Sequence, residues 1–269
     1  MSDSTNVERE GYTLSERTVG KSFDRIFDNV KNRIIVATFA SNIHRVQQII
    51  DAAVKFGRKV ALSGRSMINV ASVAIELGYL NVPEGTIIDI NDINKYTHDK
   101  LMIITTGSQG EPMSALSRMA ASTHRQLEII PGDLVVISAT PIPGNEKTVS
   151  RVINQLFKKG ANVIYNALDE IHVSGHACQE ELKLIINLTK PKFFMPAHGE
   201  YRHLKQHANL ANSMGVPKEN SFVMDLGNVL ELDNQSAKIN GSVPAGKIFV
   251  DGLGVGDVGN IVLRDRRLL

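Results

Sequence analysis

The feature that most constrains the fold of this chain is a regular alternation of short apolar runs with longer amphipathic segments. The apolar runs are rich in β-branched residues and predict buried strands over 33–39, 59–62, 101–106, 134–139, 162–165 and 192–195. The intervening segments keep helical spacing and predict helices near 43–56, 67–77, 112–121, 147–159, 179–189 and 200–213. This alternation favours an α/β fold with a mostly parallel sheet flanked by helices. Ligands of such sheets bind beyond the carboxyl ends of the strands.

The composition is that of a globular protein and excludes several classes. Of the 269 residues, 42% are hydrophobic and 22% are charged, which argues against a disordered chain. We expect no membrane partner, because no run approaches the ~18 apolar residues of a membrane span. The formal net charge of +2 does not itself indicate nucleic-acid binding, so any such site has to be local. The single cysteine, Cys178, excludes an intramolecular disulfide and fits a reducing cytoplasm.

Three polar loops follow predicted strands and could bind an anion. In Gly107–Pro112, two glycines let the backbone approach a ligand closely, and the following helix N-terminus favours an anion. Ser138–Asn145 places hydroxyl groups, including that of Thr140, at a strand end. Ser63–Ser66 places Arg65 beside a helix N-terminus. Gly107–Pro112 can equally be a tight turn, turn chemistry is favoured for Ser138–Asn145, and Arg65 can be a solvated or core-packing side chain, so no single loop specifies a function.

Histidines also lie near the ends of two predicted strands. His172 and His176 flank a Gly-containing loop, and His198 lies in the segment PAHGE. A histidine beside glycine at a sheet edge can serve as a metal ligand or an acid–base group. His203 and His207 are four residues apart on a predicted helix, and without an HExxH motif we expect them to be a solvated surface pair. No HxHxDH run occurs, so only His198 looks like a direct metal ligand.

Several segments together resemble the bacterial ribonuclease J family, in the β-CASP group of the metallo-β-lactamase superfamily. They are SDSTN, RIIVATFASNIHRVQQII, TGSQGEPMSALSRMA, PIPGN, SGHACQEELKLI, KPKFFMPAHGEYRHL and DGLGVGDVGNIVLRDRRLL. The resemblance covers essentially the whole chain. It implies a β-CASP domain over 1–176, the returning strands and helices of a metallo-β-lactamase domain over 177–245, and a linker over 246–269. Because the family's HxHxDH part and C-terminal domain have no counterpart here, we expect an excised segment.

The resemblance implies roles for individual residues. Asp3, His176 and His198 match the three conserved β-CASP motifs of the family. By this match, His198 would bind zinc, His176 would touch the scissile phosphate as electrophile or proton donor, and Asp3 would orient His176. The implied RNA-phosphate contacts are Ser108, Gln109, Thr140, Ser174, Gly175, Arg65 and Ser66.

The activity implied by the resemblance is that of a zinc-dependent ribonuclease. Members act as 5′→3′ exonucleases and endonucleases in rRNA processing and mRNA decay. The implied partners are 5′-monophosphorylated RNA and further ribonuclease J subunits in a homo- or hetero-oligomer. We expect the chain alone to bind zinc weakly at most and not to cut RNA, because one recognisable ligand cannot hold the two zinc ions implied for the parent protein. Two alternatives stay open: a module that holds RNA by phosphate contacts, and a non-catalytic scaffold subunit.

Overall fold

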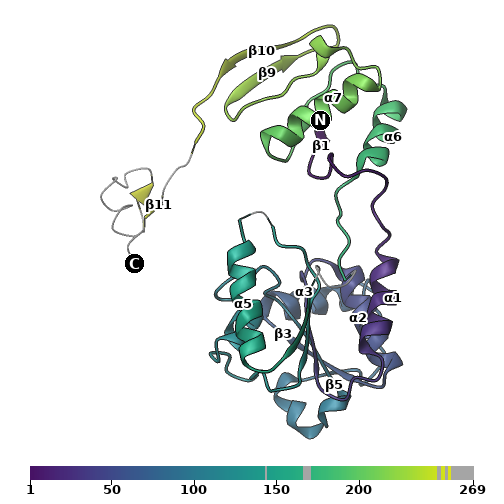
Figure 1. Cartoon of the computed structure of the whole chain (residues 1–269), viewed down its shortest axis with the longest axis vertical. Coiled ribbons are helices and arrows are strands. Elements are labelled where there is room, and N and C mark those ends of the chain that lie inside the picture. The colour runs from purple at the N-terminus through teal and green to yellow at the C-terminus, as the bar shows by residue number, and fades with distance from the viewer. Residues whose placement is uncertain (143, 166–170, 247–249, 252–253, 256–269) are drawn as a thin grey trace. The chain divides into compact units, whose positions relative to one another are not determined.

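The computed structural model describes residues 1–269 except 143, 166–170, 247–249, 252–253 and 256–269 (Figure 1). The chain forms two compact units. Thr13–Gly175 makes one unit, and Met1–Tyr12 joins His176–Leu269 in the other. Among the described residues, no helix combines the length and the apolar character needed to cross a bilayer.

A six-stranded sheet forms the centre of the unit Thr13–Gly175. Its strand order is β4-β3-β5-β2-β6-β7, and all neighbouring strands run parallel. The strands are β2 (Ile34–Ala37), β3 (Lys59–Ser63), β4 (Ile87–Ile88), β5 (Leu101–Thr105), β6 (Leu134–Ile137) and β7 (Asn162–Tyr165). Every residue of β2 and β5 is buried, as expected for strands covered on both faces. The prediction of an α/β fold with a mostly parallel sheet is therefore confirmed.

Helices cover both faces of this sheet. Residues of α1 (Arg17–Phe27), α2 (Ile43–Lys55) and α3 (Arg65–Glu76) share one apolar core, and residues of α4 (Ala115–Ala120) and α5 (Glu146–Lys158) share another. Because side chains alternate along a strand, Ile34 and Val36 contribute to the first core, whereas Ile35 and Ala37 contribute to the second. Two short 3-10 helices, η1 (Ile90–Lys95) and η2 (His98–Lys100), connect β4 to β5.

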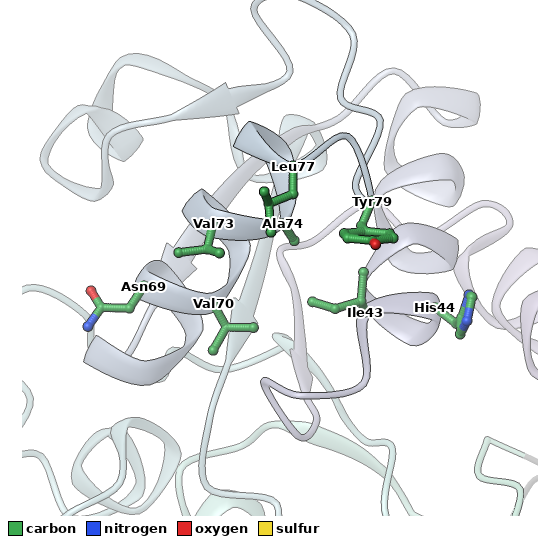
Figure 2. Close-up of a pocket in the computed structure, with 8 residues that line it drawn as sticks. All are labelled: Ile43, His44, Asn69, Val70, Val73, Ala74, Leu77 and Tyr79. Carbon is green, nitrogen blue, oxygen red and sulfur yellow. The ribbon is translucent and has the colours of Figure 1, made fainter.

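The outer side of α3 carries apolar side chains that the sheet does not cover. Val73 and Leu77 are 53% and 63% exposed, although Ala74 between them is buried. They belong to an apolar hollow of about 470 Å³ formed by α2, α3 and Tyr79 (Figure 2). Its lining residues are Ile43, His44, Asn69, Val70, Val73, Ala74, Leu77 and Tyr79.

The second unit is built around a short parallel ladder. In it, β1 (Ser2–Asp3) pairs with β8 (Pro196–Ala197), so that Ser2 lies opposite Pro196 and Asp3 lies opposite Ala197. The unit also contains α6 (Gln179–Thr189), α7 (Tyr201–Ser213), η3 (Lys218–Asn220), β9 (Asn228–Leu232), β10 (Ala237–Ser242), β11 (Val250–Asp251) and β12 (Gly254–Val255). Ile186, Phe194, Ala211 and Val216 form a small apolar core in this unit.

The structure differs from the sequence-based expectations in several places. The strand expected over 192–195 is replaced by β8 and by a single bridge between Phe194 and Ser221. Helix α1 has no counterpart among the predicted elements. Met1–Tyr12 belongs with the unit that begins at His176, and not with the remainder of the segment 1–176, because β1 pairs with β8. The predicted linker over 246–269 lies largely outside the described residues.

Candidate functional site

Three side chains that the sequence analysis singled out meet in the second unit. The Asp3 Oδ2 atom lies 2.8 Å from His176 Nδ1, and the Asp3 Oδ1 atom lies 2.6 Å from His198 Nδ1. The two imidazole rings are 5.1 Å apart between centroids. One ligand atom from each of the three residues lies within 4.8 Å of the other two, which is close enough for a shared metal ion. We call these residues the Asp3 cluster.

Backbone pairing brings the Asp3 cluster together from distant parts of the chain. The β1–β8 ladder sets Asp3 opposite Ala197, one residue before His198. The Ser4 amide continues this contact by donating to the Ala197 carbonyl at 2.9 Å. His198 has a φ of +58°, a left-handed conformation that is uncommon outside glycine. Such a conformation persists where the surrounding structure enforces it, and it occurs often at functional sites.

Two residues that the sequence analysis did not single out support the cluster. The Thr5 hydroxyl donates to Asp3 Oδ1 at 3.0 Å and lies 3.2 Å from His198 Nδ1. The Asn6 amide donates to the backbone carbonyl of His176 at 2.9 Å. The available signal was their position directly after Asp3 in the dense polar run SDSTN.

The charge on Asp3 determines how the two histidines can act. Partial burial tends to raise the pKa of Asp3, but hydrogen bonds with His176, His198 and Thr5 outweigh it and hold this pKa below its usual value. Asp3 is therefore an ionised acceptor at neutral pH, and each facing Nδ1 atom must carry the proton. The Nε2 atom of a neutral imidazole is then left as the lone-pair atom, as in carboxylate–histidine–zinc arrangements.

The expectation of a solvated pair at His203 and His207 is wrong for His207. His207 is fully buried, its Nδ1 atom lies 3.0 Å from the Ser4 hydroxyl, and its ring meets Phe194 edge to face. His203 caps α7, because its Nδ1 atom accepts from the Glu200 amide at 3.1 Å. Both side chains thus have structural contacts, since α7 turns this face toward β1 and the PAHGE segment.

The predicted phosphate contacts lie in the unit Thr13–Gly175, and their roles stay predictions. Ser108 and Gln109 are each only 3% exposed. The Gln109 side-chain amide donates to the Thr140 carbonyl at 3.0 Å and accepts from the Ile142 amide at 2.7 Å. These two hydrogen bonds of Gln109 therefore fix the conformation of the loop after β6. The Thr140 hydroxyl lies 3.0 Å from His172 Nδ1, which ties this loop to the segment after β7.

The remaining predicted contacts are more accessible. Ser174 is half-buried and Gly175 is exposed, and both directly precede His176 in the chain. Arg65 and Ser66 are exposed in the first turn of α3, where they line a cavity at the carboxyl edge of the sheet.

Two family models match the chain. The β-CASP domain of ribonuclease J matches residues 31–156, and a Zn-dependent metallo-hydrolase RNA specificity domain matches residues 161–223. Together with the parallel sheet and the Asp3 cluster, they define the class as metallo-hydrolases that carry a β-CASP domain.

Curated relatives agree with these matches. The chain is 51% identical to Ribonuclease J 1 of Streptococcus pyogenes, over 99% of this chain and 48% of the relative. It is 49% identical to Ribonuclease J2 of Bacillus subtilis, over 100% of this chain and 48% of the relative. It is 48% identical to Ribonuclease J of Thermus thermophilus, over 99% of this chain and 46% of the relative. The chain belongs to the ribonuclease J family, and it spans about half the length of the curated relatives it matches.

Proposed function

We propose that this chain carries part of the active site of a zinc-dependent ribonuclease that processes RNA. The proposal rests on one observation. The carboxylate of Asp3 lies within hydrogen-bond distance of the Nδ1 atoms of both His176 and His198. The matched RNA specificity domain and the names of the relatives support RNA as the substrate. The finer features that we propose are cytoplasmic 5′→3′ exonuclease and endonuclease action, a preference for a 5′-monophosphate, and assembly with further ribonuclease J subunits.

The His198 imidazole fits zinc, which binds imidazole nitrogen, and the Asp3 carboxylate beside it fits the supporting partner of such a ligand. His198 would bind the ion through Nε2, while Asp3 keeps the proton on His198 Nδ1 and fixes the ring. A bound zinc ion would lower the pKa of its water and polarise a phosphoryl oxygen. His176 would touch the scissile phosphate through its Nε2 side, as electrophile or as proton donor to the leaving oxygen, while its Nδ1 atom faces Asp3. Asp3 would hold that ring in place throughout.

Replacing Asp3 with asparagine should weaken zinc binding by about 10- to 100-fold. The amide keeps the size of the carboxylate but presents one acceptor atom where Asp3 presents two, so it cannot hold both Nδ1–H groups. Isothermal titration of the chain with zinc would measure the change. Asp225→Asn, at an exposed position of the same unit, is the matched control and should bind zinc like the unmodified chain. Equal zinc affinity for Asp3→Asn and the control would contradict the proposed role of Asp3.

The chain should bind a short RNA more tightly when its 5′ end carries a monophosphate than when it carries a hydroxyl group. His176→Ala should reduce this preference by about tenfold, because hydrogen bonds to a charged group are the strong ones. Fluorescence anisotropy at one fixed salt concentration would measure both affinities. His98→Ala, an exposed substitution in η2 just before the amino end of β5, should leave the preference unchanged. Equal affinity of the unmodified chain for the two RNAs would argue against a 5′-phosphate site here.

A further inference from the structure

The residue that follows Asp3 is held by helix α7. Ser4 is fully buried, and its hydroxyl oxygen lies 3.0 Å from the Nδ1 atom of His207, which is fully buried too. Side chains of neighbouring residues in an extended segment point to opposite sides, so Asp3 faces the two histidines of the Asp3 cluster while Ser4 faces α7. The contact therefore joins the back of the segment that carries Asp3 to a distant helix.

The β1–β8 ladder alone is too short to fix Asp3. It consists of two residue pairs, of which Asp3 with Ala197 is the second. Small two-stranded pairings are only marginally stable by themselves in water. A buried hydrogen bond adds a stronger constraint, because breaking it leaves polar atoms of both Ser4 and His207 without a partner. The cost of separating these two side chains therefore keeps the end of β1 beside α7.

The ring of His207 has a fixed position and one polar contact. It meets the Phe194 ring edge to face, with 4.9 Å between the centroids. Its Nε2 atom is buried and has no hydrogen-bond partner in the described part of the protein. A buried polar atom without a partner costs free energy that an apolar side chain at this position would avoid. The contact of Nδ1 with Ser4 is what an imidazole provides here and an apolar side chain cannot.

Helix α7 also holds the other side of the Asp3 cluster. It begins three residues after His198, and reciprocal contacts between Glu200 and His203 cap its first turn. His207 lies in the second turn of the same helix. One helix therefore places His198 through its N-terminus and Asp3 through His207, and sites built on regular elements are held more precisely than sites on loops.

We propose that Ser4 and His207 are positioning residues, whose contact holds the Asp3 carboxylate where it meets both Nδ1 atoms of the cluster. The inference rests on the proposed function, because that function gives the Asp3 cluster its role. Ser4 and His207 act only through Asp3. Without their contact β1 can shift, and a carboxylate displaced by about 1 Å no longer accepts from both rings at hydrogen-bond distance.

The test determines which ring nitrogens of His176 and His198 carry a proton. Long-range proton–nitrogen correlation spectra report this directly, in the metal-free chain at about pH 8, where an ordinary imidazole is neutral. In the unmodified chain we expect the proton on Nδ1 of both rings, because Asp3 accepts from each. Ser4→Ala should shift both rings toward a mixture of the two tautomers. It should also raise the Kd for zinc by about three- to tenfold, less than the loss of Asp3 itself.

Two substitutions of His207 separate positioning from stability. Asparagine places its amide where the imidazole has Nδ1, whereas glutamine places its amide near Nε2. His207→Asn should therefore keep the Nδ1 tautomers of the cluster, although it loses the Phe194 ring contact and should melt at a lower temperature. His207→Gln should lose the tautomer pattern. Ser4→Ala combined with His207→Gln should change the spectra no more than either substitution alone, because the two residues act as one unit.

Ser221→Ala is the matched control. The Ser221 hydroxyl donates to the side chain of Asn212 in α7 at 2.8 Å, so this variant removes a serine contact with the same helix without touching β1. It should keep both Nδ1 tautomers, and circular dichroism melting checks that every variant folds. If Ser4→Ala gives the same tautomers as the control, the positioning role is wrong and the proposed function stands. If the unmodified chain lacks the Nδ1 proton on both rings, the positioning role and the site behind the proposed function both fail.

Discussion

Asp133→Ala should lower the free energy of unfolding by about 3–5 kcal/mol, the cost of leaving a buried charge without its partner. Asp133 is completely buried at the amino end of β6, and Arg33 is 7% exposed. The carboxylate accepts from Arg33 Nε at 2.9 Å and from Arg33 Nη2 at 2.6 Å. It also accepts from the Ile130 amide at 2.9 Å. Removal of Asp133 therefore takes two acceptors from the Arg33 guanidinium, which keeps only the Glu128 carbonyl, and takes away the acceptor of the Ile130 amide.

Urea unfolding followed by circular dichroism would measure this loss. Asp92→Ala is the matched control, because Asp92 pairs with Lys95 at an exposed position and such pairs contribute at most about 1 kcal/mol. Asp133 directly precedes β6 at the amino edge of the sheet, whereas the loops after β5 and β6, which hold predicted phosphate contacts, lie at its carboxyl edge. RNA affinity of the folded variant at low temperature should therefore match that of the unmodified chain. A loss no larger than that of the control would mean that Arg33 finds other acceptors.

Lowering the pH from about 6.5 to about 4 should remove about 3 kcal/mol of stability through His207 alone. Burial lowers the pKa of His207 to about 4, against the opposing attraction of Asp3. The folded protein thus keeps His207 neutral, whereas the unfolded chain takes up a proton near its ordinary pKa of 6.5. The stability contributed by neutral His207 is therefore fully present above about pH 6.5, and it is lost as the pH falls from about 6.5 to about 4.

Unfolding free energies at several pH values would test this effect. In His207→Gln, which cannot take up the proton, the pH dependence between 4 and 6.5 should flatten, although the variant should be less stable at neutral pH. His98→Gln, at an exposed position, should keep the full pH dependence. If His207→Gln and the unmodified chain show parallel curves, another group is responsible for the acid sensitivity.

Local patterns predicted most of the regular elements. The helical spacing of apolar residues in each amphipathic segment indicated the helices, and α6 occupies the expected range 179–189. The strand near 192–195 was misplaced because its ladder has only two residues, Pro196 and Ala197, and depends on a distant partner. Helix α1 was missed because its segment, RTVGKSFDRIF, holds few apolar residues. Val19, Phe23 and Phe27 nevertheless make one buried face at helical spacing.

The sequence predicted some residues of the candidate site but not the contacts that other residues make. Asp3, His176 and His198 were singled out by motif, and the structure brings their side chains together. Gln109 was also predicted to touch phosphate, but its buried amide holds the loop after β6. Burial and partners come from contacts between distant segments, and a linear pattern does not contain them.

The sequence by itself determined the alternation of strands and helices, the positions of glycine-rich turns at strand ends, and the residues of the family motifs. These features depend on local backbone preference and hydrophobic spacing, which neighbouring residues encode. Only the tertiary structure decided that Met1–Tyr12 joins the unit beginning at His176, that His207 is buried, and that Arg65 and Arg118 line one cavity. Each of these facts depends on a pairing between segments far apart in the chain, because the free energy of burial is gained only when both partners are in place.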